Sequence, residues 1–149
     1  MKVISIIPPV YLFVCIAFMV LLHFLLSGAK LLGLPWNLSG LIPLALGVAL
    51  NLAADRSFKV HNISVKPLEK TTALITNGVF RVSRHPMYLG MVLILLGVAL
   101  LLGTLTSFLV VFAFVFLMDT AFIRFEEKKL EETFGEAYLE YKKKVRRWE

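Results

Sequence analysis

The longest uncharged run in this chain sets the strongest limit on its fold. Residues 87–118 form a stretch of 32 residues without a single charge. One membrane-spanning helix needs about 20 apolar residues, so this stretch is either one very long helix or two spans joined by a turn at Gly103-Thr104. A soluble domain of 149 residues with 58% hydrophobic side chains could not bury so much apolar surface. The sequence therefore predicts an all-α polytopic membrane protein.

The basic residues decide between one helix and two. Two further apolar runs, at about 3–26 and 38–54, precede the long one. If 87–102 and 105–123 form a hairpin, both termini share a side with the basic loop 55–85, and that side holds 15 of the 16 Lys and Arg. Such residues favour the cytoplasmic side. We therefore expect four spans with both termini and any active site cytoplasmic, in a prokaryotic plasma or inner membrane or a eukaryotic endoplasmic reticulum.

The tail, 124–149, predicts an amphipathic helix at the membrane interface. Apolar residues recur there at largely helical spacing among seven Glu and eight Lys or Arg. Gly135 interrupts this pattern and predicts a break into two pieces. The length leaves room for one domain, so we expect a single membrane-embedded unit over 1–149. Its first apolar run is longer than a signal-peptide core, which favours a span.

The composition also excludes some partners. The net charge of +6 does not indicate nucleic acid, because the basic residues flank apolar runs, where lipid head groups and topology account for them. The one cysteine, Cys15, lies inside an apolar run. It excludes an internal disulfide and a cysteine-based zinc site. We expect membrane lipids around the chain, no nucleic acid and no metal.

The densest polar segment runs from Arg81 to Gly90, where the basic loop enters the third span. Pro86 suits the first turn of a helix, and the free amides of that turn, with Arg84, favour an anion. The alternative is that the arginines are topogenic charges that snorkel to head groups, with Tyr88 in the aromatic belt.

A second polar segment, Arg124-Phe125-Glu126-Glu127, follows the fourth span. Two carboxylates beside a cationic loop suit the binding of hydroxyls or of a cationic ligand. The alternative is a weak surface ion pair between Arg124 and Glu127, which are three residues apart. Two polar residues at membrane depth are left open: Asp119 either extends this site or marks the boundary, and Asn51 either bridges helices or has a functional role.

Together these segments resemble the isoprenylcysteine carboxyl methyltransferase family, over about residues 45–148. Related phospholipid methyltransferases share the Pro-x-Tyr-x-Gly and Glu-Glu elements. The likeness is carried by four segments: Leu74-Ile75-Thr76-Asn77-Gly78-Val79-Phe80-Arg81, Arg84-His85-Pro86-Met87-Tyr88-Leu89-Gly90, Arg124-x-Glu126-Glu127-x-x-Leu130 and Phe134-Gly135-x-x-Tyr138-x-x-Tyr141-x-x-x-Val145-x-Arg147. The chain departs from the family at His61-Asn62-Ile63-Ser64, where members often have a Gly-Thr pair, and this bears on the substrate.

The resemblance implies a membrane methyltransferase that uses S-adenosylmethionine and a lipophilic or prenylated acceptor. Its catalytic candidates are Arg124, to orient an acceptor carboxylate, with Glu127 and His85, either of which would take a proton from an amine acceptor. A carboxylate acceptor is already ionised at neutral pH, and the sequence leaves both acceptors open. Carried over from the family, the residues that bind the cofactor are Arg84, His85, Pro86, Tyr88, Gly90, Glu126 and Glu127.

Two other functions stay open. One is a membrane NADPH-dependent sterol or enone reductase, which shares a Tyr-x-Gly helix start and a tyrosine-rich C-terminal segment. The Glu126-Glu127 pair and the Phe134-Gly135 spacing favour the methyltransferase. The other is a non-enzymatic membrane protein whose basic loop and tail bind anionic lipid.

Overall fold

The computed structural model describes residues 7–26, 29–63 and 72–148, and all regular secondary structure in these ranges is helical. Three continuous helices are long and apolar enough to cross a membrane, and a fourth apolar helix is shorter. The predicted all-helical membrane fold is confirmed. The elements are α1 (Pro8–Leu25), η2 (Trp36–Gly40), α2 (Leu41–Val60), η3 (Gly78–Arg81), α3 (Pro86–Leu102), α4 (Leu105–Leu117), η4 (Met118–Ile123), α5 (Arg124–Phe134) and α6 (Glu136–Lys144).

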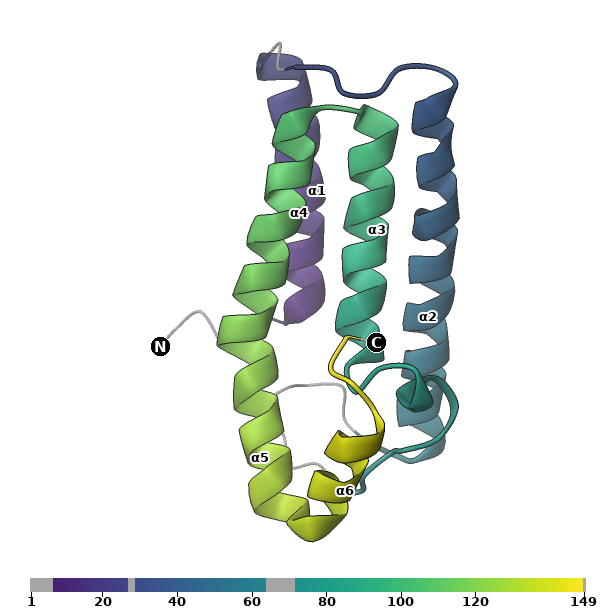
Figure 1. Cartoon of the computed structure of the whole chain (residues 1–149), viewed down its shortest axis with the longest axis vertical. Helices are drawn as coiled ribbons and strands as arrows, with labels where there is room; N and C mark the ends of the chain where they lie inside the picture. Colours follow the sequence, from purple (N-terminus) through teal and green to yellow (C-terminus); the bar gives the residue numbers. More distant parts are fainter. Residues whose placement is uncertain (1–6, 27–28, 64–71, 149) are drawn as a thin grey trace.

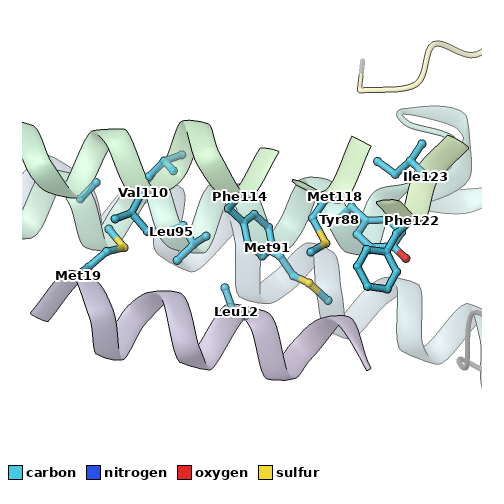
Figure 2. Close-up of a cluster of buried hydrophobic side chains, with 12 residues drawn as sticks. Leu12, Met19, Tyr88, Met91, Leu95, Val110, Phe114, Met118, Phe122 and Ile123 are labelled. Carbon is cyan, nitrogen blue, oxygen red and sulfur yellow. The ribbon is translucent and has the colours of Figure 1, made fainter. Parts of the chain in front are cut away.

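Helix α3 is the centre of the bundle (Figure 1). It packs against α2 on one side and against α1 and α4 on the other. Gly103 has a φ of 65° and makes the turn between α3 and α4, so the predicted hairpin is present. Figure 2 shows the core that results, where side chains of α1, α3 and α4 such as Leu12, Leu95 and Phe114 meet.

Glycines allow α2 and α3 to approach closely. A Cβ atom on Gly47 would lie 2.5 Å from the carbonyl oxygen of Gly90, and one on Gly97 would lie 2.6 Å from that of Gly40. Small residues at membrane helix interfaces serve this purpose, because they bring backbones into contact. Gly90 accordingly points toward α2, where Asn51 packs against it.

Main-chain hydrogen bonds close one end of the bundle, at the top of Figure 1. The loop before η2 lies against the turn between α3 and α4. Leu31 N donates to Gly103 O at 2.7 Å, and Leu105 N donates to Ala29 O at 3.2 Å. We call this the closed end.

At the opposite end of the bundle, the start of the tail differs from the separate helix predicted for residues 124–149. No break separates residue 123 from 124: η4 is a π-helical segment that joins α4 to α5, so one helix runs from Leu105 to Phe134. Helix α5 therefore continues α4 rather than starting a separate surface helix (Figure 1). The break predicted at Gly135 is confirmed, with a φ of 52° there. After it, α6 turns back, and the buried Tyr138 and Tyr141 pack it against residues 75–80.

Candidate active site

The start of α3 is held by the segment that follows α6. We call this segment, residues 145–148, the strap. Ser83 is fully buried; its Oγ donates to the carbonyl of Arg147 at 2.7 Å and accepts from the amide of His85 at 3.1 Å. The amide of Arg84 donates to the carbonyl of Arg146 at 3.1 Å. The strap thus lies directly beside the polar segment that begins α3.

Glu127 lies at the centre of the charges gathered here. It is 4% exposed and belongs to α5, beyond the apolar part of the long helix. Arg147 binds it at two points, with Nε 3.0 Å from Oε1 and Nη2 2.6 Å from Oε2. Arg84 Nη1 lies 3.1 Å from Oε1, and His85 Nε2 lies 3.3 Å from the same oxygen. Three cationic groups therefore share one buried carboxylate.

The neighbouring Glu126 has its own partners. Tyr88 donates a hydrogen bond of 2.7 Å to its Oε1. His85 Nδ1 lies 3.6 Å from its Oε2, so the imidazole lies between the two glutamates. Figure 2 shows the ring of Tyr88 where the apolar core ends, beside Met118 and Phe122. The phenol thus links the core to the carboxylates.

Asp119 belongs to this group of charges. Its Oδ1 lies 2.9 Å from Arg147 Nη1, and its Oδ2 lies 3.2 Å from Arg124 Nε. The π-helical segment explains the second contact, because the amide of Arg124 donates to the carbonyl of Asp119 five residues earlier and so stacks residues five apart. Of the two possibilities left open for Asp119, the structure favours the site. Arg124 pairs with Asp119 and not with Glu127, and its side chain is 65% exposed.

We call the six buried or half-buried groups the charged cluster. It contains Arg84, His85, Asp119, Glu126, Glu127 and Arg147, which are formally three cations and three carboxylates once His85 is protonated. Burial by itself lowers the pKa of His85, but hydrogen bonds to Glu126 and Glu127 and their charges outweigh burial and raise it. Burial raises the pKa of Glu127, but the hydrogen bonds of His85 and Arg147 and the charge of Arg84 lower it to about 2. The two glutamates thus favour the protonated form of the imidazole, beside an ionised Glu127.

Two cavities flank the charged cluster. An open groove of about 450 Å³ is lined by charged residues of α5, including Glu127, together with Lys142 and Arg147. A smaller pocket of about 70 Å³ has a polar end that includes Tyr88 and Glu126 and an apolar wall. That wall comes from α1 and the residue before it, α2, η3 and α3: Ile7, Pro8, Pro9, Phe58, Phe80, Pro86, Met87 and Met91. Glu126 and Glu127, adjacent in sequence, therefore face different cavities.

The structure brings most of the predicted site residues together. A chain of hydrogen bonds and ion pairs links Arg84, His85, Tyr88, Glu126 and Glu127 through the two glutamates. Pro86 is the buried first residue of α3. The other two predicted residues lie apart from this contact network: Arg124 lies on the rim of the groove, and Gly90 points toward α2.

Two residues of the site were not predicted, Arg147 and Ser83. Arg147 lies in the last motif of the sequence, but it is 20 residues from Glu127 along the chain, and only the reversal at Gly135 joins them. Ser83 gave no signal beyond its place between two arginines. Asn51, also left open, donates to the carbonyl of Gly47 one turn earlier, which favours helix packing over a functional role.

The similarities to known proteins cover the same region. A model of the phospholipid methyltransferase family matches residues 36–137. The chain is 44% identical over 95 residues to a protein-S-isoprenylcysteine O-methyltransferase of Saccharomyces cerevisiae, which is 62% of this chain and 38% of that one. It is 34% identical over 110 residues to protein-S-isoprenylcysteine O-methyltransferase A of Arabidopsis thaliana, 71% of this chain and 55% of that one. An uncharacterized protein of Haemophilus influenzae is 45% identical over 62 residues, 42% of this chain and 98% of that one. No solved structure matches.

These likenesses bear out the family inferred from the motifs. The chain spans only 38% to 55% of the isoprenylcysteine methyltransferases named above. The family match, however, covers more than half of this chain and contains both predicted segments, 84–90 and 124–127. The chain belongs to the phospholipid methyltransferase family.

Proposed function

We propose that this protein is a membrane methyltransferase that moves a methyl group from S-adenosylmethionine to the carboxylate of a lipophilic acceptor. The observation that carries the proposal is the position of the two glutamates. Glu127 lines a polar groove open to water, and Glu126 lines a pocket with an apolar wall. A water-soluble donor and a membrane-dissolved acceptor would meet at such a partition. Membership of the family supports the same reaction class.

The residues present suit S-adenosylmethionine. Carboxylates such as Glu126 and Glu127 accept hydrogen bonds from ribose hydroxyls or an ammonium group, and an arginine suits the methionine carboxylate. Arg84 is 8% exposed, and its Nε has no hydrogen-bond partner in the described part of the chain. A buried donor without a partner favours an acceptor from a ligand. The groove of about 450 Å³ lies within the range of small-molecule sites.

The chain's own contribution would be alignment. S-adenosylmethionine supplies an electrophilic methyl group on a positively charged sulfur. Its transfer is an in-line displacement that depends on proximity and orientation. Tyr88 and His85 fix the Glu126 carboxylate from two sides. Both therefore hold in place a group that would contact the donor.

The state of His85 favours a carboxylate acceptor over an amine. A general base must be unprotonated when the acceptor arrives. Glu126 and Glu127 raise the pKa of His85 and so favour its protonated form over the free base, and the pKa of about 2 for Glu127 makes that carboxylate a weak base. A carboxylate acceptor needs neither of them, because it is already ionised.

The surroundings of the smaller pocket support a lipophilic acceptor. Pro8 and Pro9 begin α1, Phe58 lies near the end of α2, and Met91 lies on α3. Apolar groups from three membrane helices would exclude water from a hydrocarbon chain. The bias of Lys and Arg supports a cytoplasmic position for this end.

A lipid amine is the second candidate acceptor, because the matching family model is described as phospholipid methyltransferase. Nothing in the chain's similarities favours the NADPH-dependent reductase. The lipid-binding alternative predicts that only the number of charges matters, so His85→Ala and Glu127→Gln would be harmless.

Methyl transfer to defined acceptors tests the proposal. Detergent-purified protein would receive radiolabelled S-adenosylmethionine with prenylcysteine analogues or with a whole lipid extract. We expect label in the prenylcysteine product that mild base releases as methanol, since base cleaves methyl esters and spares N-methyl groups. Base-stable label in the lipid extract alone would favour the amine acceptor.

Calorimetry tests the donor separately. We expect saturable heat with S-adenosylmethionine and none with NADPH. Binding of NADPH without binding of S-adenosylmethionine would overturn the proposal and restore the reductase.

A further inference from the structure

We propose that Arg147 is an internal ligand of Glu127, and that S-adenosylmethionine gains access to this carboxylate by displacing Arg147 together with the strap. This inference rests on the proposed function. It adds a competition between a side chain of the protein and the donor for one carboxylate.

The first observation is that both oxygens of Glu127 are already engaged. Oε1 lies within 3.3 Å of Arg147 Nε, Arg84 Nη1 and His85 Nε2, and Oε2 lies 2.6 Å from Arg147 Nη2. An ionised carboxylate has about four acceptor positions. Oε1 is therefore fully occupied and Oε2 has one position left, so a ligand that binds Glu127 through two hydrogen bonds needs one of these donors to leave.

Arg147 is the donor best placed to leave. Arg84 and His85 are fixed by the start of α3, and their side chains are only 8% and 5% exposed. The side chain of Arg147 is 29% exposed and lines the open groove. Arg147 lies in the strap, directly after α6. The hydrogen bond from Val145 N to Tyr141 O at 3.0 Å joins the start of the strap to that helix. Displacing Arg147 would move a short segment and leave the bundle intact.

Apart from the ion pairs of Arg147 and the packing of Val145, few contacts hold the strap. Its main chain accepts hydrogen bonds from Ser83 Oγ and Arg84 N. Trp148 is half-buried against the apolar core. The net stability that one hydrogen bond contributes is small, because water competes for the same groups, so a ligand that binds Glu127 can outweigh these contacts.

Asp119 gives the displaced guanidinium another partner. Arg147 Nη1 already lies 2.9 Å from Asp119 Oδ1. Asp119 has a side-chain exposure of 19%, against 6% for Glu127. Arg147 can therefore leave the more buried carboxylate and remain paired.

Competition has a consequence that sets it apart from a direct role in donor binding. The apparent affinity of a ligand is proportional to the fraction of protein molecules whose site is free to bind it. Here that fraction would be the molecules in which Arg147 does not occupy Glu127. Weakening the strap must then tighten the binding of S-adenosylmethionine. If Arg147 were itself a donor-binding residue, its removal would weaken that binding.

The two tryptophans of the chain provide the measurement. Trp36 lies in η2 near the closed end, and Trp148 lies in the strap. In a Trp36→Phe background, fluorescence reports on Trp148 alone. We expect saturating S-adenosylmethionine to make Trp148 more accessible to a water-soluble quencher such as acrylamide.

Three variants complete the test, with donor affinity measured by calorimetry. Arg147→Ala and Arg146→Ala are made in the Trp36→Phe background, and Trp148→Ala is made in the otherwise unmodified chain. Arg147→Ala should bind S-adenosylmethionine at least about fivefold more tightly and should show an accessible Trp148 before the donor is added. Trp148→Ala removes an apolar contact of the strap and changes no charged residue, so it should also tighten the binding of S-adenosylmethionine. Arg146→Ala removes the same charge from an exposed neighbour and should leave affinity and quenching unchanged.

The outcomes separate the two proposals. Weaker donor binding by both Arg147→Ala and Trp148→Ala would overturn the competition and leave the proposed function standing. So would donor binding that leaves the quenching of Trp148 unchanged. Absence of saturable S-adenosylmethionine binding in the unmodified chain would overturn both.

Discussion

The two ends of the helix bundle are closed by opposite kinds of interaction. At the closed end, neutral main-chain groups pair, as in the hydrogen bond of 2.7 Å from Leu31 N to Gly103 O. At the site end, the charged cluster joins α3, η4, α5 and the strap through ion pairs, several of them buried. Paired main-chain groups therefore close one end of the bundle, and six formal charges gather at the other.

The difference indicates which end is explained by stability alone. Backbone hydrogen bonds satisfy groups that every turn must satisfy. A buried ion pair loses hydration that its attraction often fails to recover, so apolar residues of similar volume would hold the helices equally well. This supports the proposed role of the charged cluster in binding a ligand.

The largest effect expected is on catalysis, from Glu127→Gln. This change keeps the shape of the side chain and removes the charge that Arg84, His85 and Arg147 share. We expect methyl transfer to fall by about a thousandfold, the scale on which loss of one preorganised polar contact acts. Initial rates with radiolabelled donor would measure it. Glu140→Gln on the exposed surface of α6, which lines neither cavity, is the matched control, and equal activity of the two variants would contradict the assignment.

The second prediction concerns the closed end. A side chain at Gly103 would meet the carbonyl of Leu32, and its φ of 65° disfavours any β-branched residue. We expect Gly103→Val to lower the free energy of unfolding by about 3 kcal/mol, through backbone strain and overpacking. Thermal unfolding in detergent would measure the loss.

Activity makes this variant informative about the comparison. The rate per folded molecule of Gly103→Val should stay within about twofold of the unmodified chain, because the variant touches no group of the charged cluster. A large loss of rate at full folding would show that the two ends are coupled.

Local sequence patterns predicted what local geometry determines. The turn at Gly103 and the break at Gly135 follow from glycine, and both lie where expected. Each of the four predicted apolar spans corresponds to a helix, although α3 is shorter than the other three and α2 extends to Val60, beyond the predicted end at residue 54. The segments 84–90 and 124–127 were likewise recognisable, because each carries its polar residues within a few positions. The π-helical segment was not predictable, since nothing in Met118–Ile123 departs from an ordinary helical pattern.

Contacts across the fold were the part that the sequence concealed. Arg147 reaches Glu127 only because the chain reverses between α5 and α6 (Figure 1). The spacing of residues along the sequence does not predict the direction in which α6 packs after this reversal. Gly90 was assigned to a ligand because it lies in a motif, whereas the space beside it is filled by Asn51. Both cases depend on which element packs opposite, which one sequence alone does not state.

Tyr88→Phe should have a smaller effect than loss of a glutamate. It removes the hydrogen bond of 2.7 Å to Glu126 and leaves the ring packing. A hydrogen bond to a charged group contributes about 1.5 kcal/mol or more, so we expect a loss of about tenfold in kcat/KM. Steady-state kinetics would measure it, and an unchanged rate would show that Glu126 needs no orientation.

The charged cluster should also make stability depend on pH. The pKa of His85 is raised on folding, so its contribution is fully present below the unfolded value, about 6.5, and is lost as pH rises through the folded value. The decline is at most about 1.4 kcal/mol per pH unit. The pKa of Glu127 is lowered, so the contribution of Glu127 to stability changes only at acid pH, outside the range in which His85 titrates. Unfolding from pH 6 to 9 should show the decline, and His85→Gln should abolish it.

The smallest effect expected is from Arg124→Ala, and it tests the role that the family resemblance assigns to this residue. The side chain of Arg124 is 65% exposed, and its partner Asp119 keeps a second cation, Arg147, at 2.9 Å. An exposed ion pair contributes at most about 1 kcal/mol, so stability should hardly change and methyl transfer should fall less than about threefold. Rates at several acceptor concentrations would measure this. A rise of tenfold or more in KM for the acceptor alone would instead make Arg124 the group that holds the acceptor carboxylate, and would extend the functional part of the site end from the buried cluster to the rim of the groove.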